Sequence, residues 1–280
     1  MIKNLILSSG GVNGYFFVGA LKYLLEQNLL NNLENILGTS AGSIFGLLYL
    51  LGFSIDEIIE LTTKMEPSNL LNMNVDNILS FMDDYGLDDG EKIIKIIRIV
   101  CKRKHNIVKL TFQDLFNISN ITFTIAALNI NTKKMLYFSH KNYPNMEVAE
   151  AIRMSSSIPI LFKPVIFEGN YVVDGGAQDP CSLDYFKNPK ETLGLMISIR
   201  KEKEINDLRD FMIQLFCSPL DKIVDSYYDR PNIIIFDTND SEGMNFSINT
   251  TQIKELINLG YNITKEEITD ILDYFRRTSD

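Results

Sequence analysis

The stretch from Ile36 to Gly46, ILGTSAGSIFG, most strongly limits what this chain can fold into. A short apolar run leads into Ser40, which is flanked by Gly38 and Gly42, and an apolar segment with helical character follows. The G-x-S-x-G pattern predicts a sharp strand-to-helix turn that holds a serine hydroxyl clear of the backbone, where larger flanking side chains would collide with the main chain. These five residues alone fit an ordinary glycine-rich turn equally well. The rest of the sequence must decide whether Ser40 is a nucleophile.

The bulk properties are those of a globular protein with a sizeable core. Hydrophobic residues make up 45% of the 280 residues, charged residues make up 22%, and the mean hydropathy is +0.01, which excludes disorder of the whole chain. The net charge of −9 and the pI near 4.9 argue against a nucleic-acid partner and against a general attraction to anionic membranes. The basic run Cys101–His105 remains the obvious candidate for a local basic patch.

Three cysteines at positions 101, 181 and 217 are odd in number and widely spaced, so they indicate neither a disulfide framework nor a zinc site. We therefore expect a reducing, cytoplasmic compartment, no metal and no cofactor. Periodic structure begins by Lys3, which leaves no room for a signal peptide. The longest apolar stretch, Ile44–Phe53, is shorter than the ~20 residues that span a bilayer, so any membrane contact is expected to be peripheral.

The opening of the chain predicts a βαβα unit, which is typical of a largely parallel sheet covered by helices. Its expected strands and helices are Leu5–Leu7, Tyr15–Gln27, Ile36–Leu37 and Ser43–Leu51. The middle of the chain, Ile55–Phe116, is predicted to be helical. A hairpin is expected over Ile121–Leu128 and Lys134–Ser139, and further strands are expected over Pro164–Phe167, Tyr171–Val173, Leu193–Ile199 and Asn232–Phe236.

Two helices are expected at the end of the chain, with Gly260 stopping the first and a capping box of Thr264 and Glu267 opening the second. No repeat or linker divides the sequence. We therefore expect one α/β domain over residues 1–280, with a central mostly parallel or mixed sheet flanked by helices. Its core motifs lie within residues 3–180, and a C-terminal helical part covers residues 200–280.

A nucleophilic serine needs donors for the negative oxygen that forms during acyl transfer. The loop Ser8–Gly14, SSGGVNG, lies between the first strand and the first helix, and its glycines let backbone N–H groups converge at a helix N-terminus. In a parallel sheet this loop and the Ser40 turn emerge at the same edge. A dinucleotide site is the competing interpretation, but the glycine spacing does not match G-x-G-x-x-G.

The base is harder to find, because the chain has only two histidines, His105 and His140, and neither follows a candidate acid as in an α/β hydrolase. Solvated or packed imidazoles account for both. An aspartate placed against the serine is the alternative, and Asp174 precedes two glycines after the apolar YVV. A DGG sequence is most often a turn. An aspartate base would also need desolvation to raise its basicity.

The sequence resembles the patatin-like phospholipase family over about the first two thirds of the chain. Four blocks carry the resemblance, in the family's order: LILSSGGVNGYFFVGAL, GTSAG, AIRMSSSIPILFKPV (Ala151–Val165) and YVVDGGAQDP. The resemblance implies that Ser40 is the nucleophile and Asp174 the base of a Ser-Asp dyad, with an oxyanion hole formed by the backbone around Gly10, Gly11, Val12 and Asn13. It also implies metal-independent hydrolysis of lipid acyl esters, of the phospholipase A or lysophospholipase type, through an acyl-serine intermediate.

Asn13 departs from the family pattern, which has Arg or Lys at this place, and Ser9 stands where many members have glycine. A neutral amide cannot bring a positive charge to the oxyanion, which predicts a loss of ~1–3 kcal/mol of transition-state stabilisation. Two alternatives to the lipid acyl hydrolase stay open. One is a catalytically impaired lipid-binding protein of this family, which Asn13 motivates, and the other is an esterase that acts on soluble acyl esters.

Overall fold

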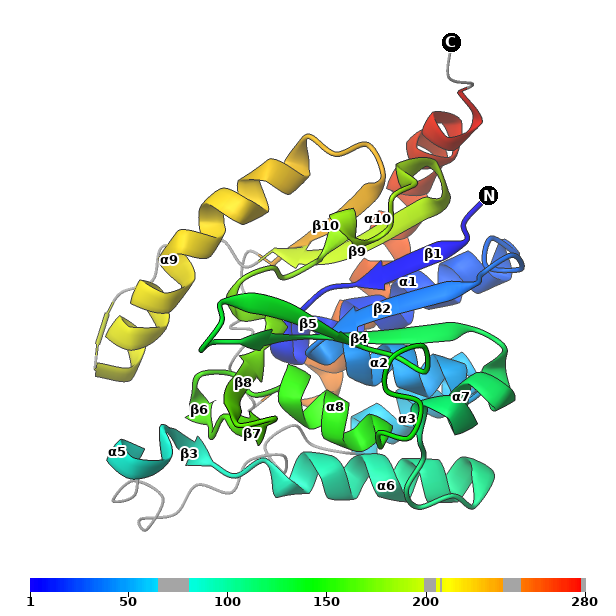
Figure 1. Ribbon diagram of the computed structural model, residues 1–280. Coiled ribbons are helices and arrows are strands. Elements are labelled where there is room, and N and C mark those ends of the chain that lie inside the picture. Colours follow the sequence, from blue (N-terminus) through cyan, green and yellow to red (C-terminus); the bar gives the residue numbers. More distant parts are fainter. Residues whose placement is uncertain (65–80, 199–204, 207, 239–247, 278–280) are drawn as a thin grey trace.

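The computed structural model describes residues 1–64, 81–198, 205–206, 208–238 and 248–277. Within these ranges a central sheet has the strand order β10-β9-β1-β2-β4-β8-β7, and β5 also pairs with β4 (Figure 1). The parallel strands are β1 (Asn4–Leu7), β2 (Asn35–Thr39), β4 (Thr122–Asn129), β9 (Thr192–Ser198) and β10 (Ile233–Asp237). The antiparallel additions are β5 (Lys134–Phe138), β7 (Val165–Phe167) and β8 (Asn170–Asp174). A short parallel pair forms a second sheet from β3 (Gly86–Asp88) and β6 (Ile160–Phe162).

The described helices are α1 (Tyr15–Glu26), α2 (Ala41–Leu50), α3 (Ile55–Lys64), α5 (Phe81–Asp84), α6 (Glu91–His105), α7 (Phe112–Ser119), α8 (Val148–Ser155), α9 (Leu208–Tyr228) and α10 (Thr250–Arg276). In Figure 1, α1, α2 and α10 lie on one side of the sheet. On the other side, the C-terminal residues of α9 pack on the sheet, whereas the rest of this helix extends beside it. Among the described helices, none is both long and apolar enough to cross a membrane.

Residues of the central strands alternate between two cores. On β1, Leu5 and Leu7 belong to the larger core with α1, α2 and α10, whereas Ile6 belongs to a smaller core with Cys181 and Tyr227 under α9. Burial on both faces is characteristic of parallel strands covered by helices. It explains why the predicted strands read as continuous apolar runs.

The prediction of a single α/β domain with a mixed sheet flanked by helices is confirmed. The expected hairpin is also present, because β4 and β5 pair antiparallel with Ile125 opposite Phe138. The middle segment is helical in α3, α6 and α7, but it also contains β3, which the sequence analysis missed. Part of that helical prediction, over residues 65–80, lies outside the described residues.

The prediction of two C-terminal helices is wrong, because α10 runs without a break from Thr250 to Arg276. Gly260 does not end a helix. A Cβ at this position would lie 2.2 Å from the Phe16 carbonyl oxygen, so glycine allows α10 to cross α1 closely. The Thr264 hydroxyl donates a hydrogen bond to the Gly260 carbonyl at 2.7 Å, which is an interaction within one helix rather than a cap.

Candidate active site

Ser40 occupies the turn between β2 and α2, at the carboxyl end of a central strand. Its backbone angles are φ 51° and ψ −120°, in a region that is costly for any residue other than glycine. The residue is only 4% exposed. Strain of this kind persists where surrounding structure holds it, and it is common at functional sites.

The two glycines of the G-x-S-x-G pattern are both required by close backbone approach. A Cβ on Gly42 would lie 2.1 Å from the Leu7 carbonyl oxygen of β1, and a Cβ on Gly38 would lie 2.6 Å from the Ser43 Cα. Neither contact leaves room for a side chain. The turn therefore packs directly against β1 on one side and against the first turn of α2 on the other.

The loop Ser8–Gly14 lies beside this turn, because Leu7 of β1 pairs with Gly38 of β2. It forms a 3-10 turn from Gly11 to Gly14 that continues into α1, and Gly11 has a φ of 54°, which favours glycine. The backbone N–H of Asn13 donates a hydrogen bond to the Gly10 carbonyl at 3.0 Å. The side chain of Asn13 is fully buried.

Distant parts of the chain hold this loop in place. The Ser8 hydroxyl accepts a hydrogen bond from the Ile197 amide of β9 at 2.9 Å, and the Ser9 amide donates to the Pro180 carbonyl at 2.8 Å. The Gly42 amide donates to the Ser8 carbonyl at 3.2 Å, which ties the loop to the serine turn. The loop after β1, the Ser40 turn after β2 and the segment around Pro180 that follows β8 therefore meet at one edge of the sheet.

Asp174 ends β8 and faces the same edge. It pairs with Ala127 of β4, while Thr39 on the other side of β4 pairs with Ala126, so Asp174 and Ser40 flank β4 at the same level. Burial raises the pKa of Asp174 to about 7. Hydrogen bonds from the Ser40 side chain and the Gly176 amide act in the opposite direction, but burial is the larger effect. The structure thus brings together the two residues that the sequence analysis paired.

The segment Arg153–Ser157 contacts both members of this pair, and the sequence analysis gave its side chains no role. The Ser155 hydroxyl accepts a hydrogen bond from the Ser40 amide at 2.8 Å. The Ser157 carbonyl accepts one from the Asp174 amide at 3.0 Å. Ser40 and Ser155 are 115 positions apart in the sequence, and Ser157 and Asp174 are about 17 apart. Local sequence patterns carry no signal for such pairs.

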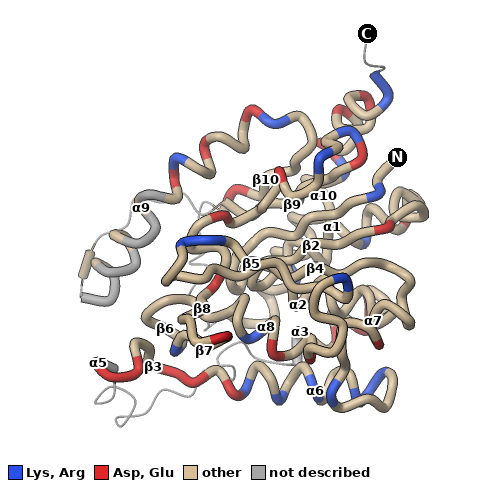
Figure 2. The backbone as a smooth tube through the Cα atoms, in the orientation of Figure 1, with Lys and Arg blue, Asp and Glu red and all other residues tan. Residues whose placement is uncertain are grey.

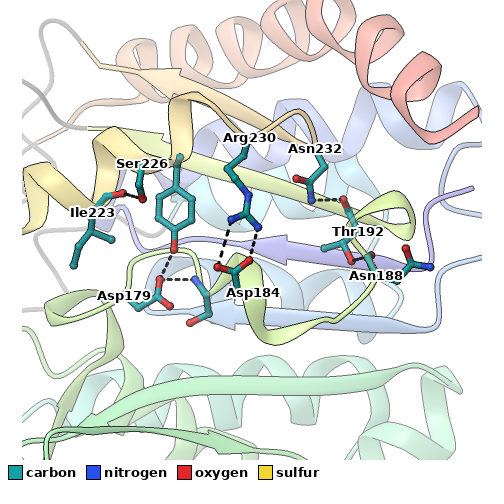
Figure 3. Close-up of polar contacts among 10 residues, drawn as sticks. Asp179, Asp184, Asn188, Thr192, Ile223, Ser226, Arg230 and Asn232 are labelled. Carbon is teal, nitrogen blue, oxygen red and sulfur yellow. Dashed lines mark hydrogen bonds and ion pairs between the residues drawn. The ribbon is translucent and has the colours of Figure 1, made fainter. Parts of the chain in front are cut away.

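The chain that follows Asp174 is fastened to α9 by a polar cluster (Figure 3). The Asp179 carboxylate accepts hydrogen bonds from the Tyr227 hydroxyl at 2.6 Å and from the Ser182 amide at 2.7 Å. Arg230 pairs with Asp184 on the same side of the sheet (Figure 3). Because Pro180 lies within this stretch and holds the Ser9 amide, the cluster also supports the loop beside Ser40.

Both histidines lie in settings that account for them without chemistry. His105 Nε2 contacts the Leu51 carbonyl at 2.8 Å, at the far end of α2 from Ser40, and this ten-residue helix is about 15 Å long. His140 stacks on Phe116, with 4.0 Å between ring centroids. In Figure 2, positions of Lys and Arg recur along the backbone of α6, where Lys104 of the basic run pairs with Glu57 at 2.9 Å.

Similar proteins occur in two viruses. An uncharacterized protein of Acanthamoeba polyphaga mimivirus is 28% identical over 289 residues, covering 98% of this chain and 96% of its own length. A protein named probable lipid hydrolase of Invertebrate iridescent virus 6 is 27% identical over 256 residues, covering 91% of this chain and 84% of its own length.

Solved structures support the fold. VipD from Legionella pneumophila has a TM-score of 0.64 at 18% identity, and the match covers 98% of this chain and 67% of VipD. The type III effector ExoU has a TM-score of 0.55 at 15% identity, with 97% of this chain and 53% of ExoU covered. A sequence model described as patatin-like phospholipase matches residues 5–187, well over half of the chain. The chain therefore belongs to the patatin-like phospholipase family.

Proposed function

We propose that this protein is a lipid acyl hydrolase of the phospholipase A or lysophospholipase type, with Ser40 as nucleophile and Asp174 as base. Family membership and the lipid hydrolase among its viral relatives support the hydrolysis of lipids in general. One observation carries the finer assignment. A buried carboxylate with a pKa of about 7 accepts a hydrogen bond from a serine that is held in a strained turn.

In the proposed reaction, the Ser40 oxygen attacks the ester carbonyl carbon while its proton passes to the Asp174 carboxylate. The carbonyl oxygen becomes negative and is stabilised by backbone N–H groups around Gly10, Gly11, Val12 and Asn13. When the tetrahedral intermediate collapses, the ester C–O bond breaks and the leaving alcohol takes the proton from Asp174. Water then attacks the acyl-serine carbonyl carbon while Asp174 accepts a proton from it. The bond between the acyl carbon and the Ser40 oxygen breaks, Ser40 takes the proton back from Asp174, and the fatty acid is released.

The raised pKa makes an aspartate competent for this task. An ordinary aspartate in water is a weak base, with a reference pKa near 3.9. A pKa of about 7 matches proton transfer near neutral pH much better. No histidine is needed to relay the proton, which agrees with the positions of His105 and His140 away from Ser40.

Asn13 favours a second candidate, a lipid-binding protein of the same family with little or no turnover. Its side chain is fully buried within the glycine loop and carries no charge. It therefore lacks the positive charge near the oxyanion that the family's usual Arg or Lys supplies. The missing charge should cost ~1–3 kcal/mol of transition-state stabilisation. We therefore expect a reduced rate of hydrolysis rather than none.

Covalent labelling tests the proposal most directly. Wild type and Ser40→Ala are treated with a fluorophosphonate probe, followed by intact-mass measurement and peptide mapping. We expect one adduct on Ser40 in wild type and none in the variant. Binding of phospholipid vesicles without any adduct, unchanged in Ser40→Ala, would instead support the lipid-binding candidate.

A substrate series separates the lipid hydrolase from an esterase of soluble esters. Hydrolysis is measured for one acyl ester at concentrations below and above the point at which it aggregates. A lipid hydrolase that meets its substrate by peripheral membrane contact should become much faster above that point. A rate that follows only the monomer concentration would identify a soluble-ester esterase.

A further inference from the structure

The segment from Arg153 to Ser157, at the end of α8, lies between the two proposed catalytic residues. Ser155 and Ser157 are fully buried and Arg153 is 4% exposed. Each of these three residues makes hydrogen bonds that reach outside the segment or fix its shape. We call Arg153, Ser155 and Ser157 the α8 brace.

Ser155 holds the nucleophile turn to the sheet. Its hydroxyl accepts a hydrogen bond from the Ser40 amide at 2.8 Å and donates one to the Ala126 carbonyl of β4 at 2.6 Å. Ser40 has a strained backbone, so a fixed amide helps to keep the turn from relaxing. Without Ser155, a buried N–H and a buried carbonyl would both lose a partner.

Ser157 holds the base. Its carbonyl accepts a hydrogen bond from the Asp174 amide at 3.0 Å. Only one residue, Ser156, separates Ser155 from Ser157, so this short segment sets the spacing between the backbone of the nucleophile and the backbone of the base. Small displacements matter here, because proton transfer depends on hydrogen-bond distance and alignment.

Arg153 anchors the brace to the second sheet. Its guanidinium donates to the Asp89 carbonyl at 2.8 and 3.0 Å, to the Lys163 carbonyl at 2.8 Å and to the Ser157 hydroxyl. A Cβ on Gly90 would lie 2.0 Å from the Arg153 Nε, so the chain is closely packed around this group. A buried cation with this many oxygen partners fixes the segment firmly.

We propose that the α8 brace is a positioning element that aligns the Ser40 hydroxyl with the Asp174 carboxylate for acyl transfer, with Ser155 holding the nucleophile and Ser157 holding the base. The brace contacts no reacting atom. This inference rests on the proposed Ser-Asp function and adds residues that act through the dyad.

The SSS triplet provides its own control. Ser156 is buried like its neighbours, at 6% exposure, but its hydroxyl has no hydrogen-bond partner within the described part of the chain. Ser155→Ala and Ser156→Ala therefore remove the same atom from adjacent buried positions, and only the first breaks a bond to Ser40. Ser155→Cys keeps the side-chain size and weakens the hydrogen bonds.

The experiment measures the rate of fluorophosphonate labelling of Ser40 between about pH 5 and pH 9, together with kcat and KM on one acyl ester. We expect Ser155→Ala to lower the high-pH labelling rate and kcat by ~10–100-fold, with Ser155→Cys intermediate and Ser156→Ala within about twofold of wild type. KM should change little. The apparent pKa of the rate should stay near its wild-type value, because Asp174 remains buried.

A general loosening of the fold gives a different result. Water would then reach Asp174, and the apparent pKa of the rate would fall toward that of an ordinary aspartate in both alanine variants. That outcome, or a Ser155→Ala rate equal to that of Ser156→Ala, overturns the inference while leaving the proposed function intact. If wild type itself forms no adduct on Ser40, the proposed function fails first and the inference falls with it.

Discussion

At the scale of single residues, the nucleophile turn depends on the absence of side chains. Gly42 approaches the Leu7 carbonyl so closely that a Cβ on Gly42 would lie 2.1 Å from the Leu7 oxygen. The backbone of Gly42 is held in α2 and that of Leu7 in β1. A Cβ on Gly46, one turn further along α2, would meet side chains instead, with the Phe123 ring at 3.1 Å and the Ile36 Cγ2 at 3.4 Å. A ring can move by a few tenths of an ångström, whereas a sheet backbone cannot.

We therefore expect Gly42→Ala to push α2 away from β1, to lower the free energy of unfolding by about 1–3 kcal/mol and to reduce the labelling rate of Ser40 by ~100-fold or more. Gly46→Ala is the matched control, because the gain of about 1 kcal/mol in helix propensity offsets a tight ring contact. Urea unfolding and fluorophosphonate labelling measure the two effects. Equal rates in the two variants would contradict the close-packing argument.

A second prediction at this scale concerns Asp174. Asp174→Asn keeps the shape of the side chain but removes the proposed base, so we expect hydrolysis to fall by at least ~1,000-fold while the near-ultraviolet circular dichroism stays that of wild type. In wild type, the rate should rise with pH through about 7 as the carboxylate loses its proton. A variant that kept most of its activity would show that another group acts as base.

Sequence could predict Ser40 and Asp174 because each lies in a short motif whose glycines have a local purpose. It could not predict Ser155, because the bond from Ser155 to the Ser40 amide spans 115 positions. It also could not assign Arg153, whose oxygen partners are main-chain carbonyls that any residue supplies. Interactions with backbone atoms leave no trace in the identity of the partner residue.

At the scale of elements, the pairing of α1 with α10 shows the same limit. Gly19 and Gly260 both lie where the two helices touch, and a Cβ on Gly19 would be 1.9 Å from the Ile257 carbonyl oxygen. Sequence patterns treat a glycine within a helix as a candidate end. Only the partner helix reveals that this glycine serves close packing, which is why the expected break at Gly260 was wrong.

We expect Gly19→Ala to separate α1 from α10 and to lower the free energy of unfolding by about 1–3 kcal/mol, although alanine favours helix more than glycine does. Lys22→Ala, on the same helix, is the comparison: it loses the contact of the Lys22 ammonium with the Tyr261 ring of α10 and should lower the free energy of unfolding by no more than about 0.5–1 kcal/mol. Thermal unfolding followed by far-ultraviolet circular dichroism compares the two. A stabilised Gly19→Ala variant would mean that the helices can separate without cost.

At the scale of the whole molecule, one large core joins residues from Ile2 to Ile271. The family match ends at residue 187, yet β9, β10 and α10 lie beyond it and complete the sheet and the core. A strand from this later part of the chain lies next to the first strand, because β1 pairs with β2 on one side and with β9 on the other. Apolar periodicity predicts such strands one by one, but not which of them become neighbours.

The buried Asp174 also makes the stability of the molecule depend on pH. Its pKa is raised from 3.8 to about 7 in the folded state, so its contribution to stability is fully present below about pH 4 and is lost as pH rises through about 7. Asp174→Asn lacks this decline. We expect the variant to gain about 2–3 kcal/mol in free energy of unfolding relative to wild type between about pH 5 and pH 8.

Urea unfolding of wild type and Asp174→Asn at both pH values tests this prediction. Glu57 and Glu191 also make stability depend on pH, in the opposite direction, because their lysine partners lower their pKa values. Their contribution is the same in both proteins, so it cancels in the difference between the two free energies of unfolding. A difference that does not change with pH would show that the Asp174 carboxyl titrates like an exposed aspartate.

The loop beside Ser40 has a consequence for protein synthesis. It is translated well before the segments that hold it, because Ser8 is held by the Ile197 amide and Ser9 by the Pro180 carbonyl. Asp174 is likewise made long after Ser40. A chain still on the ribosome, or one released early by a premature stop, therefore cannot complete the contacts of this loop until Ile197 has emerged. Under the proposed function, we expect such incomplete chains to hydrolyse no lipid.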